Sequence, residues 1–365
     1  MSLVTPNNIS QEMPPKTTGS GLIEGPVFPD YPELAKQFHE NGYVVIEGII
    51  PREECKQIIG LFWDFIEGLN PNLSRRDQTN WMDPFEWPIN TRGLIQHYNV
   101  GFQKFTVKAR NYVKNAFAML YGTDELISSF DGVSFSKRPK MYKFQNIEDW
   151  HKKKWDKDEV HVDQTHKGFR CVQGGAAIVN QFEEGHVFVC IPGSHLHHDE
   201  LVDRIAENAP KVLNEDWYKI DGSDKTWIKK KGLDIMRVPM KSGSVILWDS
   251  RLIHSSTSWC RSSTQKMFIP YRLQIFVCMK PADCLTEVDK VKRNKAYIEG
   301  RTSRHIPDNI TLFGKNPRMY GPVSNYAKLK VPKSCELTDD EKKLYGLIDY
   351  SSVDAEEIDE MEIED

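Results

Sequence analysis

The sequence lacks long hydrophobic runs, cysteines at CxxC spacing and long basic stretches, since the run Lys229-Lys230-Lys231 is short and is expected to lie in a solvated loop. No apolar run in the 365 residues approaches the roughly 18 residues that a membrane-spanning helix needs. The seven cysteines include no CxxC pair and are odd in number, which argues against a zinc ribbon or a disulfide scaffold. A reducing environment fits this cysteine usage better than an oxidising one.

The two ends of the chain differ in composition from the rest. Residues 1–24 are rich in Pro, Gly, Ser, Thr and Asn and predict a disordered leader, without the basic and apolar regions of a secretory signal. Residues 336–365 predict an acidic, largely disordered tail, and the terminal Ile363-Glu364-Asp365 is not a peroxisomal or endoplasmic-reticulum signal. We therefore expect a cytoplasmic protein.

The net charge of −4 conceals an asymmetry. Residues 354–365 carry eight acids and no base, so the remainder of the chain sums to +4. This weakly basic remainder has no stripe of Lys and Arg interleaved with aromatic residues, which predicts no nucleic-acid partner. We expect no membrane partner either, and the oligomeric state is left open.

Residues 25–335 predict one domain in which helices precede strands. Helical patterns cover residues 32–40, about 51–66 and about 103–121, and Asn41-Gly42 closes the first. Short β runs separated by turn signals then cover residues 132–135, 141–144, 171–179, 187–191, 244–248 and 271–279, after an isolated strand at 43–48. This order predicts a mainly β protein with packed helices: a double-stranded β-helix (jelly roll, cupin-like) core with N-terminal helical support.

His161-Val162-Asp163 places two metal-ligand side chains two residues apart. On an extended strand this spacing points both side chains to one face. His254, which follows the predicted strand at 244–248, is the candidate third ligand. Two imidazoles and one carboxylate suit Fe(II) and leave coordination positions open, whereas structural zinc prefers a closed set with thiolates.

Arg272 is the second unusual residue, because it lies within an apolar β run. A charged side chain is costly there unless it is paired. Inside a barrel, its guanidinium group matches the distal carboxylate of 2-oxoglutarate. Arg261, in the polar loop at 260–263, is the rival for this role.

Together these motifs resemble the phytanoyl-CoA dioxygenase family of Fe(II)/2-oxoglutarate oxygenases, over roughly residues 33–305. The resemblance rests on residues 38–48, His161-Val162-Asp163, residues 191–195, residues 243–254 and Arg272, in this order. It implies a double-stranded β-helix, Fe(II) and 2-oxoglutarate as cofactors with O₂, and catalytic iron ligands at His161, Asp163 and His254. It further implies cosubstrate contacts at Arg272 and, as weaker candidates, Gln173, Asn180 and Tyr142.

Two departures from the family pattern bear on these assignments. The interval from His254 to Arg272 is longer than usual, which keeps Arg261 open, and residues 180–185 lack the usual Asn-Gly pattern. Among the remaining candidates, we expect His195 to support a loop and His197 and His198 to face solvent. We expect Trp248 in the core and Trp259 near a substrate pocket.

The expected function is a dioxygenase that hydroxylates an unactivated C–H bond of a small molecule, with release of succinate and CO₂. One alternative is a non-catalytic, cupin-like metal- or ligand-binding protein that forms no succinate. A second is a metal-dependent hydrolase, which would need a general base beside the metal and would work without oxygen. The sequence does not predict the substrate.

Overall fold

The computed structural model describes residues 16–17, 23–24, 27–82, 86–88, 93–213, 217–261, 271–314 and 329–350. The leader expected at 1–24 lies outside these residues, apart from β1 (Lys16–Thr17) and β2 (Ile23–Glu24), which pair with each other. Residues 351–365 of the expected acidic tail also lie outside them.

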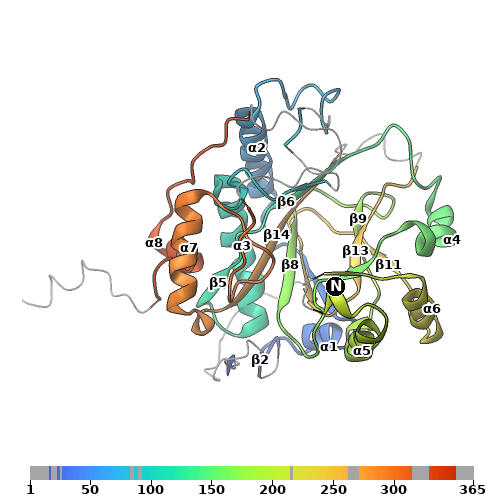
Figure 1. Cartoon of the computed structure of the whole chain (residues 1–365). Coiled ribbons are helices and arrows are strands. Elements are labelled where there is room, and N and C mark those ends of the chain that lie inside the picture. Colours follow the sequence, from blue (N-terminus) through green and yellow to red (C-terminus); the bar gives the residue numbers. More distant parts are fainter. Residues whose placement is uncertain are drawn as a thin grey trace, which may run out of the picture.

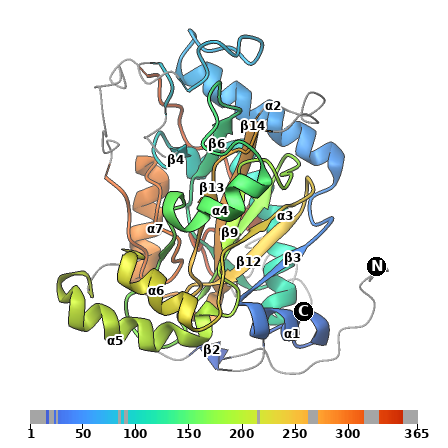
Figure 2. The ribbon, with the colours of Figure 1, turned by 90° about the vertical axis from the view of Figure 1, so that its right-hand side faces the viewer.

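Two antiparallel sheets form the centre of the molecule (Figures 1 and 2). The larger sheet has the order β3-β12-β8-β14-β6-β4, with β5 also paired to β14: β3 (Tyr43–Ile46), β12 (Val245–Asp249), β8 (Val172–Ala177), β14 (Tyr271–Pro281), β6 (Val133–Lys137), β4 (Leu94–Ile95) and β5 (Leu126–Ser128). The smaller sheet has the order β10-β7-β13-β9-β11: β10 (Tyr218–Lys219), β7 (His161–Val162), β13 (His254–Thr257), β9 (Val187–Cys190) and β11 (Met236–Val238). These sheets form the double-stranded β-helix that the sequence predicts.

Helices cover both sides of this β-helix (Figure 1). The helices α2 (Arg52–Leu69), α3 (Lys104–Tyr121), α7 (Glu287–Glu299) and α8 (Asp339–Leu344) lie on one side. The helices α4 (Ile147–Lys157) and α6 (Gly222–Lys230) lie on the other, and α1 (Pro32–Asn41) and α5 (His198–Asn208) lie at the lower end in this view.

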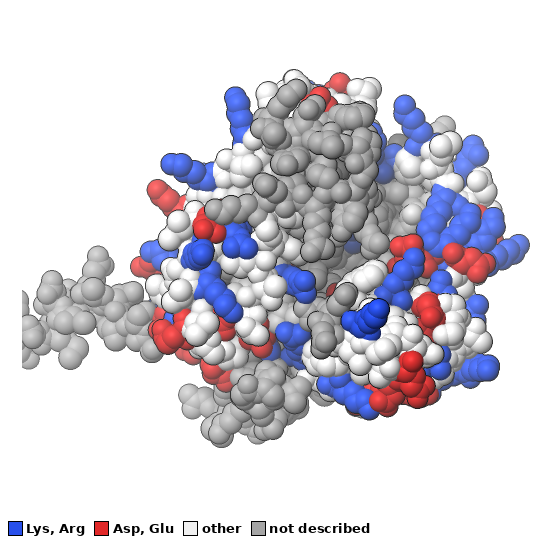
Figure 3. All heavy atoms as spheres, viewed as in Figure 1, with Lys and Arg blue, Asp and Glu red and all other residues white. Residues whose placement is uncertain are grey.

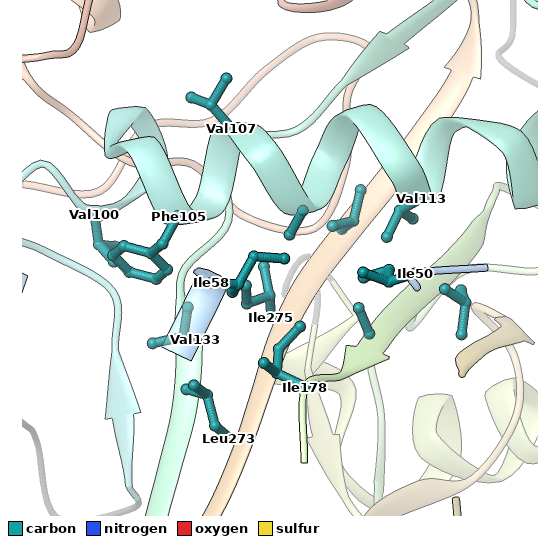
Figure 4. Close-up of a cluster of buried hydrophobic side chains, with 14 of the residues drawn as sticks. Ile50, Ile58, Val100, Phe105, Val107, Val113, Val133, Ile178, Leu273 and Ile275 are labelled. Atoms are coloured by element: carbon teal, nitrogen blue, oxygen red, sulfur yellow. The ribbon is translucent and has the colours of Figure 1, made fainter. Parts of the chain in front are cut away.

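The main core lies between the larger sheet and the helices α2 and α3. Figure 4 shows Phe105 and Val113 of α3 pointing toward Val133 and Ile275 of the sheet. All four side chains are at most 1% exposed. The helical apolar spacing of α2 and α3 thus supplies the expected N-terminal support, because one stripe of each helix is buried against the strands.

The predicted helices and strands agree with the structure, except for the strand predicted at 141–144. Residues 141–144 form no strand; only Phe144 makes a single bridge, to Cys260. The helices α4 and α6 are additional elements that the sequence analysis does not predict. Each helix has an N-cap residue, Asn146 for α4 and Asp221 for α6. In both cases the side chain accepts a hydrogen bond from the backbone N–H three residues later.

The packed body continues beyond residue 335, where the sequence places the end of the domain. Thr338 and Glu341 form a reciprocal capping box at the start of α8. Tyr345 is fully buried, and its hydroxyl donates to the Gly101 carbonyl at 3.0 Å. The Tyr350 hydroxyl donates to the Leu126 carbonyl at 2.7 Å. Residues 336–350 therefore pack on the body, although the sequence assigns them to a tail.

The surface carries charges of both signs (Figure 3). Lysines gather over α4, where Lys152, Lys153 and Lys157 contribute three of them. No helix within the described ranges is long and apolar enough to cross a membrane.

Candidate active site

The three predicted metal ligands come together on the smaller sheet. His161 opens β7, Asp163 directly follows it, and His254 opens β13, where it is the register partner of His161. One ligand atom from each residue lies within 4.8 Å of the others. The Asp163 carboxylate lies 3.5 Å from His161 Nε2 and 3.4 Å from His254 Nε2. Such a cluster can hold one ion on a single face.

Neighbouring groups fix the orientation of the His254 ring. Its Nδ1 lies 2.9 Å from the Leu252 carbonyl. Because a carbonyl only accepts, this contact assigns the proton to Nδ1 and leaves the Nε2 lone pair directed toward Asp163. The ring stacks on Phe188 at 5.7 Å and lies 5.3 Å from the Trp248 ring. The tautomer therefore suits metal binding through Nε2.

Asp163 is held in its charged form. Burial alone would raise its pKa, but the adjacent His254 and His161 hold the pKa well below its usual range. Gln173, on β8 of the larger sheet, donates from Nε2 to Asp163 Oδ2 at 3.1 Å. A neighbour that orients a ligating carboxylate is typical of metal sites. The donor set, one carboxylate and two imidazoles, fits Fe(II).

A cavity of about 730 Å³ opens between the sheets at this cluster. Its wall includes the three predicted ligands and Arg272 of β14. Aromatic and polar side chains complete the lining, including Phe188, Trp217, Trp248, Trp259, Phe276, Lys137, Lys143, Ser136 and Gln96. Trp248 is 1% exposed and also belongs to a buried cluster, and Trp259 is 9% exposed. Both tryptophans lie where the sequence analysis expects them.

Arg272 is a buried cation without a carboxylate partner among the described residues. It is 2% exposed, and burial lowers its pKa to about 9, so it stays charged at neutral pH. Its guanidinium group donates to Ser134 Oγ at 2.6 Å, to Gln181 Oε1 at 3.4 Å and to Gln274 Oε1. A buried charge paired only with neutral groups is costly, and an anionic ligand in the cavity would offset that cost.

Gly175 on β8 makes room for the support of Arg272. A Cβ atom added to Gly175 would lie 2.1 Å from Gln274 Nε2. The same Gln274 accepts hydrogen bonds at Oε1 from Arg272 and from Gln181. Any side chain at position 175 would therefore displace the group that holds Arg272.

The three weaker candidates for cosubstrate contacts, Gln173, Asn180 and Tyr142, lie in different environments. Gln173 lies against Asp163 rather than Arg272. Asn180 is exposed and accepts from the Ser242 backbone N–H at 2.7 Å in a turn. The Tyr142 hydroxyl accepts from Arg138 Nε at 2.5 Å. Neither Asn180 nor Tyr142 is among the described residues that line the cavity.

Arg261, the rival of Arg272, lies in an exposed position. Its backbone N–H donates to the Phe144 carbonyl at 3.0 Å. It does not line the cavity either, whereas Arg272 does.

The histidines of the turn after β9 have different environments. His195 Nε2 lies 3.0 Å from the His39 carbonyl, so this residue supports the α1 region as expected. His198 is 1% exposed, and its Nε2 lies 3.0 Å from the Gln164 carbonyl. The expectation that His198 faces solvent is wrong, because α5 turns its first residue inward.

Two further histidines, His186 and His305, line the cavity, although no sequence motif predicts either of them there. His186 precedes β9; burial and then the nearby Arg272 and Arg237 lower its pKa well below the usual value, so it is neutral. His305 lies after α7, 51 positions beyond His254 in the sequence, and no spacing relates it to the ligands. Only the fold brings these two side chains to the site.

The fold and this donor set define a class: double-stranded β-helix proteins with a two-histidine, one-carboxylate cluster. The family model "Phytanoyl-CoA dioxygenase (PhyH)" matches residues 38–259. The chain belongs to this family of Fe(II)/2-oxoglutarate oxygenases, so it is an enzyme whose cofactors are iron and 2-oxoglutarate. The matched residues include the cluster but end before β14 and Arg272.

Individual relatives are distant. Ava biosynthesis cluster protein O from Aspergillus versicolor is 23% identical over 284 residues, which cover 76% of this chain and 86% of the relative. Among solved structures, the epimerase SnoN with Fe3+, alpha ketoglutarate and nogalamycin RO is 17% identical, with a TM-score of 0.43, over 69% of this chain and 84% of that one. The structure of EctD from S. alaskensis with 2-oxoglutarate and 5-hydroxyectoine is 17% identical in sequence, with a TM-score of 0.42. The match covers 74% of this chain and 84% of that one.

Proposed function

We propose that this oxygenase hydroxylates an unactivated C–H bond of a small-molecule substrate and releases succinate and CO₂. In this proposal, His161, Asp163 and His254 bind the iron and Arg272 binds the distal carboxylate of 2-oxoglutarate. The single observation that carries the proposal is the shared cavity: a three-ligand cluster and an unpaired buried cation line the same 730 Å³ space. A hydrolase does not require such a cation, whereas an anionic ligand would offset the cost of burying Arg272 among neutral partners.

The residues of the chain would bind the metal, orient the cosubstrate and keep water out of the cavity. His161, Asp163 and His254 would hold the iron, and a set of only three protein ligands would leave room for the cosubstrate and oxygen. When bound, iron with 2-oxoglutarate supplies the oxidising power, and the protein supplies position and dry walls. Trp248 and Phe188 pack on the His254 ring and keep water from that side of the cluster.

The proposed role of Arg272 follows from its geometry and burial. A guanidinium group matches a carboxylate with two parallel hydrogen bonds. Ser134, Gln181 and Gln274 hold it without neutralising it, so its charge is available to a ligand. Arg261 is not proposed, because it is exposed.

The test has two stages. Purified protein is first titrated with Fe(II) and 2-oxoglutarate without oxygen, and we expect one equivalent of each to bind, with the visible charge-transfer band of a chelated keto acid. Oxygen is then admitted together with pools of small metabolites, and succinate is measured. Succinate that depends on Fe(II), oxygen and one pool supports the proposal.

The controls separate the alternatives. The variant His151→Ala changes an exposed histidine of α4 and should behave as wild type. Binding of both cofactors without succinate from any pool would favour a non-catalytic binding protein. Turnover of a substrate with Zn(II) and without oxygen would favour a hydrolase.

A further inference from the structure

His305 and Asp131 form a hydrogen-bonded pair at the wall of the cavity. His305 Nδ1 lies 3.0 Å from Asp131 Oδ2. The Asp131 side chain is 4% exposed, and the same Oδ2 accepts from Ser129 Oγ at 2.5 Å. Since a carboxylate accepts, the pair fixes a proton on His305 Nδ1 and sets the orientation of the ring.

Hydrogen bonds join the segment that carries His305 to the connection between β5 and β6. Ser303 Oγ accepts from the Phe130 N–H at 2.8 Å, and the Ser303 N–H donates to the Phe130 carbonyl at 3.3 Å. Ser303 also bridges to Leu312. These contacts hold the segment around His305 in place. The segment lies outside the residues 38–259 that match the family model.

His305 lies beside the metal cluster but away from the proposed cosubstrate anchor. Its ring is 5.2 Å from Phe276 and 6.5 Å from Trp248, whose own ring is 5.3 Å from His254. Arg272 lies four residues before Phe276 on β14, about 13 Å along an extended strand. A cosubstrate that runs from the cluster to Arg272 therefore leaves the His305 end of the wall to another ligand.

The other edge of the His305 ring is available to such a ligand. The side chain is 24% exposed, and it lines the cavity. Within the described residues, no hydrogen bond to Nε2 accompanies the one that Nδ1 makes to Asp131. Its neighbours Phe276 and Trp248 are apolar rings, which strengthen any polar contact made between them.

We propose that His305, held by Asp131, is a substrate-binding residue that recognises a carboxylate or other acidic oxygen on a largely apolar substrate. This inference rests on the proposed function, because it assigns the 2-oxoglutarate carboxylate to Arg272. Phe276, whose ring lies 5.2 Å from His305, and Trp217, which lines the same cavity, would hold the apolar part of the substrate. A paired imidazolium donor favours an anionic oxygen over a neutral one of the same shape.

The charge of His305 supports this role. Burial alone would lower its pKa, but the charge and hydrogen bond of Asp131 raise it to about 9. At neutral pH both ring nitrogens then carry protons, and Nε2 is a donor.

The experiment uses two matched probes, 3-phenylpropionate and 3-phenylpropanamide, which have the same shape and differ in charge. Each is titrated into full-length protein saturated with Fe(II) and 2-oxoglutarate without oxygen, and binding is followed by calorimetry. For wild type and His151→Ala we expect the carboxylate to bind about tenfold or more tightly than the amide. For His305→Ala and Asp131→Asn we expect this preference to be lost.

A second variant and a second measurement separate charge from structure. His305→Gln keeps a hydrogen-bond donor without the charge, and it should bind both probes with similar affinity. In ¹⁵N-histidine-labelled protein, the carboxylate should shift the His305 Nε2 resonance, and the amide should do so less. All variants should retain the wild-type affinity for 2-oxoglutarate.

Three results would overturn the proposal: no preference in wild type, an unchanged preference in His305→Ala, or release of bound 2-oxoglutarate when the carboxylate probe is added. These results differ from failure of the proposed function. In that case no pool of metabolites would give succinate that depends on Fe(II) and oxygen, whatever the response of the protein to the two probes.

Discussion

His161 and His254 are direct partners across β7 and β13, and their rings lie 4.6 Å apart. Because the two strands are antiparallel neighbours, the sheet itself sets the separation of these two rings. Asp163 then completes the cluster from the chain immediately beyond β7. Strand pairing thus fixes the two imidazoles of the proposed metal site, whereas the position of Asp163 depends on the chain after β7.

The first prediction concerns the proposed ligands. Asp163→Ala should lower the affinity for Fe(II) by more than about 100-fold, since loss of an outer-shell partner alone costs about 10–100-fold. Anaerobic Fe(II) titration measures this loss. Asp203→Ala, which changes an exposed acid of α5, is the control and should not alter the affinity. Equal affinities in the two variants would contradict the assignment of Asp163.

The second prediction concerns the support of Asp163. Gln173→Ala removes the 3.1 Å hydrogen bond to Oδ2, and it should weaken Fe(II) binding by about tenfold while leaving the ligands in place. Gln57→Ala, at an exposed glutamine of α2, is the matched control. If Fe(II) affinity stays at the wild-type value in Gln173→Ala, the hydrogen bond does not orient the carboxylate.

The third prediction concerns Arg272. Arg272→Met should raise the dissociation constant for 2-oxoglutarate by about 100-fold or more, because the ligand carboxylate loses a charged, two-pronged partner in a buried site. Fe(II) affinity should change little. The comparison with Arg261→Ala is decisive: if that exposed substitution weakens 2-oxoglutarate binding more than Arg272→Met does, the anchor is Arg261.

The fourth prediction concerns pH and the stability of metal-free protein. The pKa of His305 is about 9 in the folded chain, above the usual 6.5. A raised folded-state pKa adds stability that is complete below about pH 6.5 and disappears as pH rises through about 9. The free energy of unfolding should therefore exceed that of His305→Gln by on the order of 1–3 kcal/mol at pH 6, with a smaller difference at pH 10. Urea unfolding at the two pH values measures this, and a difference that grows with pH would refute it.

The fifth prediction concerns the segment after residue 335. Tyr345 is fully buried; its ring stacks on Phe130 with centroids 5.6 Å apart, and its hydroxyl donates to Gly101. Tyr345→Ala should lower the free energy of unfolding by about 3–5 kcal/mol, and Tyr345→Phe by only about 1 kcal/mol. Thermal or urea unfolding of the two variants tests this order. Wild-type stability in Tyr345→Ala would mean that this segment does not contribute to the core.

The sequence predicts most of the fold because its helices and strands have clear local periods. The apolar stripes of α2 and α3 and the β-branched runs of β3 and β12 need no distant information. The sequence misassigns residues 141–144 because this stretch has the composition of a strand, yet within the described part of the chain it makes only the single bridge from Phe144 to Cys260. The helices α4 and α6 are mostly polar, so their capping residues were the only signal.

The site was less predictable than the fold. His161-Val162-Asp163 has a recognisable spacing, but Gln173 and His305 reach the cavity through pairings between distant segments. Sequence alone also left Arg261 and Arg272 as rivals, and burial distinguishes them. The role of Asp131 had no local signal, since its partner follows 174 positions later.

The absence of a side chain at Gly175 has a consequence for the choice of keto diacid. If Arg272 anchors the cosubstrate as proposed, its position would set the length of dicarboxylate that can reach from the metal to the guanidinium group. Gly175 leaves the space in which Gln274 holds that guanidinium. On the proposed assignment, a methyl group at position 175 would change which keto diacid fits, and oxaloacetate, one carbon shorter than 2-oxoglutarate, becomes the informative competitor.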